Sequence, residues 1–515
     1  MSVKVTTIGL KGMEGYKVTV EVHAINGPEA ISIVGLPDAS VKEAKDRMYA
    51  ALHSLRCVLS DHKIIIHLSP GEQKKNGTLY DLPMAIGVLK EMGEIHGKLD
   101  PSTGFIGELS LDGGVQPTEG MLPAILAAKK IGLKRLYLPY DETIPSYPFD
   151  GMELVYISSV QEVMKHIDGQ KILSFPIKPV VVEPQQSEKW TVTFQQIVGH
   201  EHAKRALEIA AAGGHHLFMT GPPGCGKSML AESVVSILPK LDIEDQLEVI
   251  SLYNLSGAKL ESGAYCPFRS PHHSSSSVSI IGGGQRPKPG EISLAHHGVL
   301  FLDEMAEFTK KTLDMLRQPL ESGTVTISRA SGTVTFPSQF MLIGAMNPCP
   351  CGYLGSNTIY CSCPPKQIIN YQNRLSGPIR DRFDIFLNLK PVDFHKKTNV
   401  EQESSAIVQE RVSNARNLQY ERYKGKLLNS RVSFDTLITT SPLEPKQLNL
   451  LRELSASQNL SNRAQLKIMR LARTISDLDQ SEIITDQSIW EAMKLYRRDK
   501  QEKIQAYEWK GRSAF

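Results

Sequence analysis

The stretch Gly221-Pro-Pro-Gly-Cys-Gly-Lys-Ser228 fits the pattern G-x-x-x-x-G-K-[ST] and decides the fold of the chain around it. Glycines let the backbone turn tightly, so that successive N–H groups point at one set of phosphate oxygens. The apolar run 217–220 predicts a strand before the loop, and 228–238 predicts a helix whose N-terminus faces the anion. A chance match in a surface loop is the alternative, and the flanking strand and helix argue against it. We expect an ATP site formed by Gly221, Pro222, Pro223, Gly224, Cys225, Gly226, Lys227 and Ser228, with Lys227 at the β- and γ-phosphates, Ser228 at Mg²⁺ and Cys225 at a variable position.

A second motif, Gly298-Val-Leu-Phe-Leu-Asp-Glu304, is an apolar run that ends in two acids. Such a run is typical of a parallel strand that is covered on both faces. Asp303 at its end is expected to coordinate Mg²⁺, and Glu304 to act as the general base on the attacking water. The alternative is a strand end with two solvated acids. The phosphate-loop pattern earlier in the chain favours the catalytic interpretation.

Two further segments contribute candidate catalytic residues. Residues 340–347 predict a third apolar strand that ends in Asn347, whose amide could orient the water, although a strand-capping role is the alternative. In the segment 376–384, Arg380 and Arg382 are too far along the chain to be placed by spacing. In ring ATPases an arginine from one subunit completes the neighbour's site. A local Arg–Asp surface pair is the alternative, and such pairs contribute little stability.

The chain resembles the magnesium-chelatase-like AAA+ ATPases of the ComM/YifB type over nearly its whole length. The resemblance is carried by many short motifs in the same order. They include Ile31-Ser-Ile-Val-Gly-Leu-Pro37, Asp81-Leu-Pro83, Gly107-Glu-Leu-Ser-Leu-Asp112, Ala203-Lys-Arg-Ala-Leu-Glu-Ile-Ala210, Pro271-His-His273, Gly282-Gly-Gly284, Pro289-Gly-Glu-Ile-Ser293, Ala345-Met-Asn-Pro-Cys-Pro-Cys-Gly352 and Ala472-Arg-Thr474.

The resemblance implies roles for three of the candidate residues. Asn347 corresponds to the sensor-1 residue, Arg382 in Asp-Arg-Phe-Asp is similar to the arginine finger, and Arg463 resembles the sensor-2 arginine. The family's usual residue at position 380 is apolar, so Arg380 departs from the pattern at a position close to the finger. The family also implies a homo-oligomeric, hexameric ring that moves on DNA.

Composition and periodicity divide the chain into parts. A length of 515 residues predicts roughly three domains. Residues 1–170 alternate strands and helices, with strands expected at 16–22 and 64–68 and a helix at 81–92. The proline-containing stretch 171–189 predicts a linker. Residues 190–395 form the expected α/β ATPase core, and 396–515 the expected C-terminal helical lid, with helices at 400–424, 445–458, 461–478 and 485–498.

The N-terminal part resembles the Lon-protease-like α+β domain (S5 domain 2-like), whose members use a Ser–Lys pair. In the stretch 75–83 no serine is present and Asp81 stands near the nucleophile position, and the lysine is missing around 118–121. A nucleophile without its base cannot be activated. We therefore expect a non-catalytic assembly or partner-binding domain.

Four of the seven cysteines cluster as Cys-x-Cys, nine residues, Cys-x-Cys: Cys349, Cys351, Cys361 and Cys363. In a cytosolic chain such clustering favours metal over disulfide. Four thiolates fit a closed structural Zn²⁺ site. Because the spacing is not the commoner C-x₂-C pair, free thiols in a loop remain the alternative.

Two insertions are candidates for contact with DNA. Residues 321–337 predict a hairpin with Arg329 just before its tip, and 269–291 form an expected flexible insertion that carries Arg269, Arg286 and Lys288. By resemblance both insertions face the central pore of a ring, and Arg286, Lys288 and Arg329 are the expected DNA-binding residues. Packing of subunit against subunit is the alternative. A metal-ligand role for His272 and His273 is disfavoured, because no carboxylate or cysteine stands in register with them.

Charge and hydropathy agree with a soluble, cytoplasmic enzyme. The net charge is only +3, so any DNA contact must be local. Residues 1–15 lack the apolar core of a signal peptide, and no apolar run is long enough to cross a bilayer.

The expected function is that of a ring-forming ATPase that couples ATP hydrolysis to movement on DNA. The resemblance implies branch migration of recombination intermediates, as in natural transformation. A motor that remodels protein partners without binding DNA, like the chelatase subunit, is the main alternative. We expect the N-terminal domain to be foreign to that subunit, which favours the DNA function. A nucleotide-switched scaffold is a third possibility, and Glu304 argues against it because a pure switch needs no base.

Overall fold

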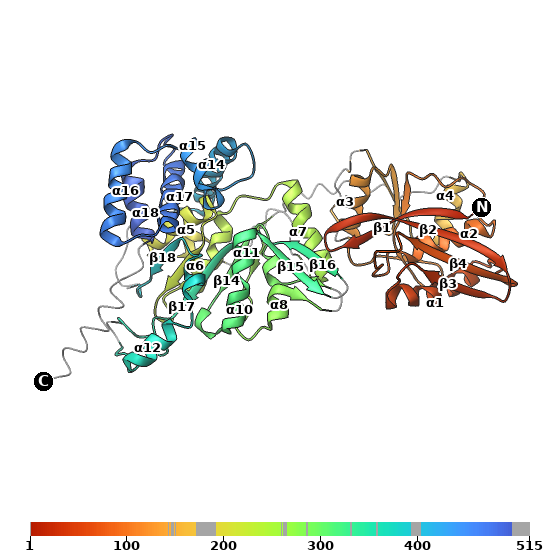
Figure 1. Cartoon of the computed structure of the whole chain (residues 1–515), viewed down its shortest axis with the longest axis horizontal. Helices are drawn as coiled ribbons and strands as arrows, with labels where there is room; N and C mark the ends of the chain where they lie inside the picture. The colour runs from red at the N-terminus through yellow and green to blue at the C-terminus, as the bar shows by residue number, and fades with distance from the viewer. Residues whose placement is uncertain are drawn as a thin grey trace.

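The computed structural model has an N-terminal domain at one end, a nucleotide-binding core in the middle and a helical region packed on the core (Figure 1). It describes residues 2–142, 144–145, 149, 151–170, 192–258, 260, 265–284, 287–329, 332–356, 359–392 and 403–496. The expected linker 171–189 and the candidate Arg286 lie outside these ranges. No described helix is long and apolar enough to span a membrane.

The N-terminal domain is a mixed seven-stranded sheet in the order β3-β4-β2-β1-β5-β8-β9. The predicted strand at 16–22 is the middle of β2, where Val18, Val20 and Val22 alternate with more exposed residues and are fully buried. The predicted helix at 81–92 is α2, which is buried along nearly its whole length. The elements are β1 (Val3–Lys11), β2 (Glu14–Asn26), β3 (Ala30–Val34), α1 (Ala39–Ser54), β4 (His62–Ser69), α2 (Asp81–Glu91), β5 (Thr103–Phe105), β6 (Glu108–Leu109), β7 (Val115–Gln116), α3 (Met121–Ile131), β8 (Arg135–Leu138), β9 (Glu153–Tyr156) and α4 (Val160–Ile167).

The core is a five-stranded parallel sheet in the order β11-β14-β17-β10-β18. The three predicted apolar strands are β10, β14 and β17, and β14 and β17 are buried throughout. The predicted helix after the phosphate loop is shorter than expected and continues as a 3₁₀ helix, η2. The elements are η1 (Phe194–Gln196), α5 (Glu201–Gly213), β10 (Leu217–Thr220), α6 (Lys227–Ser233), η2 (Val234–Ile237), α7 (Ile243–Ser256), β11 (Phe268–Arg269), α8 (Ser277–Ile281), β12 (Gly282–Gly283), β13 (Lys288–Pro289), α9 (Glu291–Leu294), β14 (Val299–Leu302), η3 (Met305–Glu307), α10 (Lys310–Met315), α11 (Arg317–Ser322), β15 (Thr324–Arg329), β16 (Gly332–Pro337), β17 (Met341–Met346), α12 (Pro365–Gln372), α13 (Gly377–Arg380) and β18 (Ile385–Asn388).

Both predicted insertions have regular structure. The hairpin β15–β16 pairs Arg329 with Gly332 at its tip, and its buried face, Val325, Ile327 and Phe336, joins the apolar core around α7 and α9. Glu321, at the start of the predicted hairpin, belongs instead to helix α11. The insertion expected to be flexible contains helix α8 and the two-stranded β12–β13 sheet.

The C-terminal region is helical, as its periodicity predicts: α14 (Ser405–Tyr423), η4 (Asn429–Arg431), α15 (Phe434–Thr440), α16 (Pro445–Gln458), α17 (Asn462–Leu478) and α18 (Asp486–Tyr496). Ser461 caps α17 by accepting a hydrogen bond from the Ala464 N–H, which satisfies one free donor of the first turn. The apolar stripe of α17 packs with α5 and α14 in one core that continues into the nucleotide-binding sheet.

The N-terminal domain meets the core at α7 and at the hairpin β15–β16 (Figure 1). Leu247 of α7 joins the apolar cluster of α3, and the Gly120 N–H donates to Asn254 Oδ1 at 2.8 Å. In the tight β1–β2 turn Gly12 has φ +65°, and a methyl group there would lie 2.6 Å from Val334 of the hairpin. The hairpin is thus packed against the N-terminal domain of its own chain.

Candidate functional site

The candidate nucleotide site lies at one edge of the parallel sheet. The phosphate loop follows β10, Asp303 and Glu304 follow β14, and Asn347 follows β17. These strands are neighbours and parallel, so their carboxyl ends meet at the same edge. The sheet brings together three motifs that are far apart in the sequence.

Lys227 is the one charged residue of the phosphate loop, and it is buried. Its Nζ donates to the carbonyl oxygens of Gly221 at 2.8 Å and Pro222 at 2.9 Å, and to Asn347 Oδ1 at 3.1 Å. A lysine ammonium has three protons, and each has a partner here. Asn347 is therefore within one hydrogen bond of the group that would reach the phosphates, which fits the position expected for it.

Ser228 and Asp303 fit a magnesium ion. Ser228 Oγ donates to Asp303 Oδ2 at 3.0 Å. Neighbouring ligands of an octahedral Mg²⁺ with bonds of about 2.1 Å lie about 3 Å apart, so these two oxygens are spaced as two ligands of one ion. When bound, Mg²⁺ would neutralise charge on the β- and γ-phosphates.

Glu304 has an unusual backbone and one side-chain neighbour that the sequence did not predict. Its φ is +48°, in the left-handed region that few residues other than glycine adopt, and its N–H donates to Asp303 Oδ1 at 2.8 Å. Its Oε2 lies 3.4 Å from His273 Nδ1. The expectation that this histidine has no carboxylate in register is therefore wrong. The signal available in the sequence was only the Pro-His-His motif, because the strand pairing that brings it to Glu304 is tertiary.

The arginine candidates lie apart from the phosphate loop. Arg382 pairs with Glu321 of α11, and the Arg380 Nη2 donates to the Gln372 carbonyl at 2.7 Å. Arg463 is exposed on the first turn of α17. Within the described parts of the chain, no hydrogen bond or ion pair joins Arg382 or Arg463 to the phosphate loop.

Sequence reasoning missed Lys467, which ties the helical region to the Arg382 segment. Its Nζ donates to the carbonyl oxygens of Asp381 at 2.6 Å and Phe383 at 2.8 Å, and lies 3.0 Å from Asp384 Oδ1. Burial alone would raise the pKa of Asp384. Lys467, His215 and His216 outweigh burial and hold that pKa well below its usual range.

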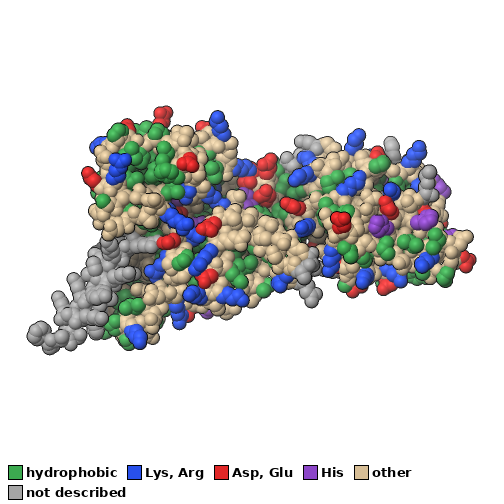
Figure 2. Space-filling view, in the orientation of Figure 1, with side chains coloured by type: hydrophobic (Ala, Val, Ile, Leu, Met, Phe, Trp, Pro, Cys, Tyr) green, Lys and Arg blue, Asp and Glu red, His purple; other side chains and the backbone are tan. Residues whose placement is uncertain are grey.

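The candidate DNA contacts differ in their surroundings. Arg329 is exposed at the hairpin tip, and a methyl group on Gly283 would lie 3.5 Å from its Nη2. Lys288 Nζ lies 2.8 Å from Glu119 Oε1 of the N-terminal domain. Arg269 forms a two-pronged pair with Glu291, at 2.6 and 2.8 Å. On the face drawn in Figure 2, basic and acidic side chains are interspersed and form no continuous basic stripe.

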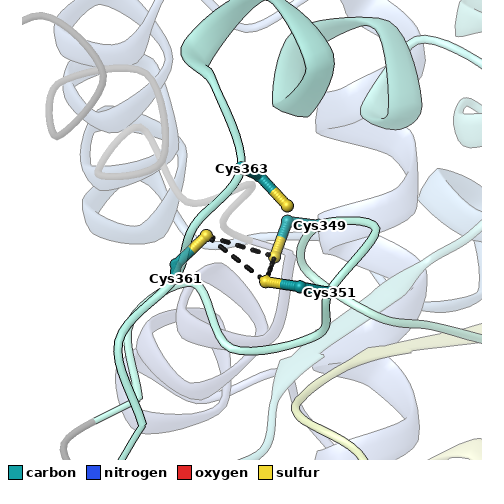
Figure 3. Close-up of side chains that lie close together, drawn as sticks. All are labelled: Cys349, Cys351, Cys361 and Cys363. Atoms are coloured by element: carbon teal, nitrogen blue, oxygen red, sulfur yellow. Dashed lines mark hydrogen bonds between the residues drawn. The ribbon is translucent and has the colours of Figure 1, made fainter.

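The four clustered cysteines converge (Figure 3). Cys349 Sγ lies 3.3 Å from Cys351 Sγ and 3.6 Å from Cys361 Sγ, and the last two sulfurs are 3.5 Å apart. The sulfur of Cys363 completes the cluster, in which all four sulfur atoms lie within 4.8 Å of one another. The loop also touches the nucleotide site, since a methyl group on Gly352 would lie 2.5 Å from Pro223.

A second cluster, Glu248 with His296 and His297, is better explained by hydrogen bonds than by a metal. Glu248 Oε2 lies 2.9 Å from His296 Nε2 and 3.2 Å from His297 Nε2. The Gln339 N–H donates to His296 Nδ1 at 2.9 Å, so a neutral His296 carries its proton on Nε2 and donates it to Glu248. A metal ion at Nε2 would require that proton to leave.

Asp81, near the expected position of the protease nucleophile, is fully buried on α2. Its Oδ2 lies 2.8 Å from Arg47 Nη2 and accepts from the Leu109 N–H at 3.3 Å. Lys75 is also buried, and its Nζ donates to the Pro70 carbonyl. These contacts give both groups structural partners within the domain.

Comparison with known proteins shows the family of this chain. Residues 193–397 match the family model "Magnesium chelatase, subunit ChlI", and 402–497 match the model of its C-terminal part. The chain is 38% identical over 486 residues to "Uncharacterized protein YifB" of Escherichia coli, with 94% of each chain covered. It is 38% identical over 490 residues to "Competence protein ComM" of Haemophilus influenzae, covering 94% of this chain and 95% of that one. The chain belongs to the magnesium-chelatase-like AAA+ proteins of the ComM/YifB type.

Two further matches concern the N-terminal domain and the fold. "Lon protease 2" of Bacillus subtilis is 26% identical over 166 residues, which is 29% of this chain and 30% of that protein. Residues 20–142 match a model described as "Subunit ChlI of Mg-chelatase". That match contradicts our expectation that the N-terminal domain is foreign to the chelatase subunit. The fold is that of an AAA+ α/β core with a helical C-terminal region and a Lon-like N-terminal part, and membership of this ComM/YifB-type family supports ATPase activity with ATP and Mg²⁺.

Proposed function

We propose that this ComM/YifB-type chain is a subunit of a hexameric ring that couples ATP hydrolysis to movement on DNA, with branch migration of recombination intermediates as its task. In this proposal Lys227 binds phosphate, Ser228 and Asp303 hold Mg²⁺, Glu304 is the general base and Asn347 orients water. Arg463 would contact the nucleotide when the helical region closes. A cytoplasmic location is part of the proposal.

The observation that carries the ring is the position of Arg382. The free subunit assembles the phosphate loop, Glu304 and Asn347, but the guanidinium of Arg382 is held by Glu321. In a site completed in trans, the arginine finger of a subunit does not contact the phosphate loop of its own chain, and the pairing of Arg382 with Glu321 agrees with this arrangement. Ring closure would exchange Glu321 for the phosphates of the neighbour.

The DNA part of the proposal is supported by the hairpin β15–β16 and by one relative. Arg329 is exposed at the tip of an element outside the ATPase sheet. A ring would present one such arginine per subunit, and this multiplicity can hold phosphates without a basic chain overall. The relative named "Competence protein ComM" supports a role in competence.

The test is a filter-binding assay with single-stranded and forked DNA, with and without ATP. We expect binding of both DNAs that is tighter with ATP and weaker as salt rises. A movement assay on a branched substrate follows. Absence of DNA binding by protein that hydrolyses ATP would contradict the proposal.

The alternative is a motor that remodels protein partners without DNA. It is favoured by the ChlI match of residues 20–142 and by the pairing of Lys288 with Glu119. ATPase activity that is stimulated by a protein partner, and not by DNA, would support it.

We further propose that Cys349, Cys351, Cys361 and Cys363 hold one structural Zn²⁺. Zinc–sulfur bonds of about 2.3 Å place tetrahedral sulfurs about 3.8 Å apart, close to the spacing of the three sulfurs in mutual contact. Metal analysis of protein purified without chelator should find about one Zn²⁺ per chain. The Cys361→Ser variant should lose the metal. The Cys57→Ser variant should retain it, because Cys57 lies in the N-terminal domain and outside the cluster. Absence of zinc from active protein would contradict the site.

A further inference from the structure

Helix α12 lies between the loop of clustered cysteines and the segment that carries Arg382. It begins soon after Cys363, with Pro364 as its N-cap residue, and ends at Gln372. Helix α13 follows and ends at Arg380, two residues before Arg382. In Figure 1, α12 lies at the end of the core that is remote from the N-terminal domain. The chain therefore runs from the cysteine cluster through two short helices to the candidate arginine finger.

Two hydrogen bonds at Gln372 join the two ends of this segment. Its Nε2 donates to the carbonyl oxygen of Pro348 at 3.1 Å, and Pro348 lies between Asn347 and Cys349 in the chain. Its main-chain carbonyl oxygen accepts from Arg380 Nη2 at 2.7 Å. A hydrogen bond from a guanidinium is charge-assisted and roughly twice as strong as a neutral one. One residue at the end of α12 thus contacts both the cysteine loop and α13.

The backbone around Arg382 is fixed relative to Arg380. The Arg382 N–H donates to the Ile379 carbonyl at 3.0 Å, and the Phe383 N–H donates to the Arg380 carbonyl at 3.2 Å. Ile379 and Phe383 are fully buried in the same apolar core. Lys467 holds the turn from the side of the helical region, through the carbonyl oxygens on either side of Arg382. A shift of α13 would therefore move the backbone of Arg382 with it.

We propose that Arg380 is a positioning residue, which through Gln372 holds the Arg382 segment in place relative to the cysteine loop, so that the Arg382 guanidinium reaches the nucleotide of a neighbouring subunit. This role of Arg380 rests on the proposed role of Arg382 in trans. Arg382 contacts the phosphates, and Arg380 acts through it. Because Pro348 adjoins Asn347, the alternative role of the same contacts is support of the nucleotide site of their own chain.

The test uses mixtures in which only a mixed interface is active. Lys227→Ala subunits supply the finger, and Arg382→Ala subunits supply the phosphate loop. Arg380→Leu is placed in one subunit type at a time. In the Lys227→Ala subunit it should lower the recovered kcat about five- to twenty-fold, because a small displacement of a catalytic group has a large effect on rate. In the Arg382→Ala subunit it should leave kcat and KM for ATP within about two-fold of the starting mixture.

Three further variants separate positioning from a general loss of structure. Arg380→Lys keeps a cationic donor for the Gln372 carbonyl and should restore about half of the lost activity. Gln372→Met removes the bond to Pro348 and should give the same one-sided loss, about two- to five-fold. Lys366→Leu removes an exposed cation from the first turn of α12 and should leave both mixtures unchanged. Circular dichroism and gel filtration check folding and assembly, and Gln372→Met gives the comparison where Arg380→Leu does not fold.

The outcomes distinguish the role of Arg380 from that of Arg382. Equal losses from Arg380→Leu in the two subunit types, or no loss in either, would overturn the positioning role while the active starting mixture still supports a finger in trans. A loss confined to the Arg382→Ala subunit would assign the contacts to the nucleotide site of their own chain and would also overturn it. A starting mixture of assembled subunits that recovers no activity would contradict the role of Arg382 in trans, and the role of Arg380 with it.

Discussion

The candidate nucleotide site and the two insertions both belong to the α/β core, but they differ in which part of the protein their side chains contact. Every group of the nucleotide site follows a strand of one parallel sheet, and the contacts Lys227–Asn347 and Ser228–Asp303 stay within the core. The insertions, in contrast, also contact the N-terminal domain. Lys288 meets Glu119 of the N-terminal domain, and the hairpin packs on the β1–β2 turn.

A sequence motif is sufficient to place a residue when the residue follows a buried strand, but not when it lies on an insertion. A residue at the end of a buried parallel strand is placed by the sheet, so its neighbours follow from the strand order. The position of a basic residue on an insertion depends on the elements that pack against that insertion. Its charge is offset when a carboxylate pairs with it, and it then binds phosphate less strongly. Substitutions in the nucleotide site and in the insertions test this contrast.

The largest effect is expected at Glu304. Glu304→Gln should bind ATP but hydrolyse it at least about 100-fold more slowly, because a positioned general base is lost. Nucleotide binding is measured with a fluorescent ATP analogue and turnover by phosphate release. Lys227→Ala is the comparison, and it should weaken binding itself, since a charge-assisted phosphate contact is lost. Normal turnover by Glu304→Gln would remove it from the site.

The next effect concerns Lys467, which joins the helical region to the Arg382 segment. Lys467→Met should lower the free energy of unfolding by about 2 kcal/mol near neutral pH, because a buried carboxylate loses its cation. The contribution of Asp384 is present above its unfolded pKa of about 3.9 and is lost as pH falls. The variant should therefore unfold in acid at a higher pH than the wild type.

Urea unfolding across pH measures the effect of Lys467→Met, with circular dichroism as the signal. Lys446→Met is the matched control, because Lys446 pairs with Asp486 on the exposed side of the same helical region. Equal behaviour of the two variants would show that the Lys467–Asp384 pair contributes no more than an exposed one.

Arg382 tests whether the nucleotide site is complete within one chain. Arg382→Ala and Lys227→Ala should each be inactive, and an equal mixture should recover about a quarter of wild-type activity, because one interface in four combines an intact loop with an intact finger. Glu321→Ala removes the partner of Arg382 and should keep activity. Mixtures of assembled variants that never exceed their parents would contradict a role in trans.

The smallest effect is expected at the insertions. Arg329→Ala should weaken DNA binding about five- to ten-fold at low salt and reduce the salt slope by about one, with DNA-free hydrolysis unchanged. Lys288→Ala should have less effect, because Glu119 already offsets its charge. Glu119→Gln should tighten DNA binding. Equal losses from Arg329→Ala and Lys288→Ala in a filter-binding titration would break the contrast between a free and a paired cation.

Much of the fold was predictable because buried strands and amphipathic helices leave strong periodic patterns. Val18, Val20 and Val22 alternate as a half-buried strand does, and α16 has the predicted limits because Pro445 begins it. The positions of the candidate nucleotide-site motifs were also predictable, since the phosphate loop, the two acids and Asn347 each follow an apolar run that forms a strand. Helix α6 ended earlier than predicted and passed into 3₁₀ geometry, which periodicity does not distinguish from an α-helix.

The sequence by itself determined the phosphate loop, the two acids after β14, the asparagine after β17 and the cysteine cluster, because local spacing and strand burial specify them. Only the tertiary structure decided the partners of the remaining charged groups. His273 with Glu304, Lys288 with Glu119, Arg382 with Glu321 and Lys467 with Asp384 join residues that lie far apart along the chain. Such contacts leave no periodic pattern or fixed spacing in the sequence, so only tertiary packing brings their members together.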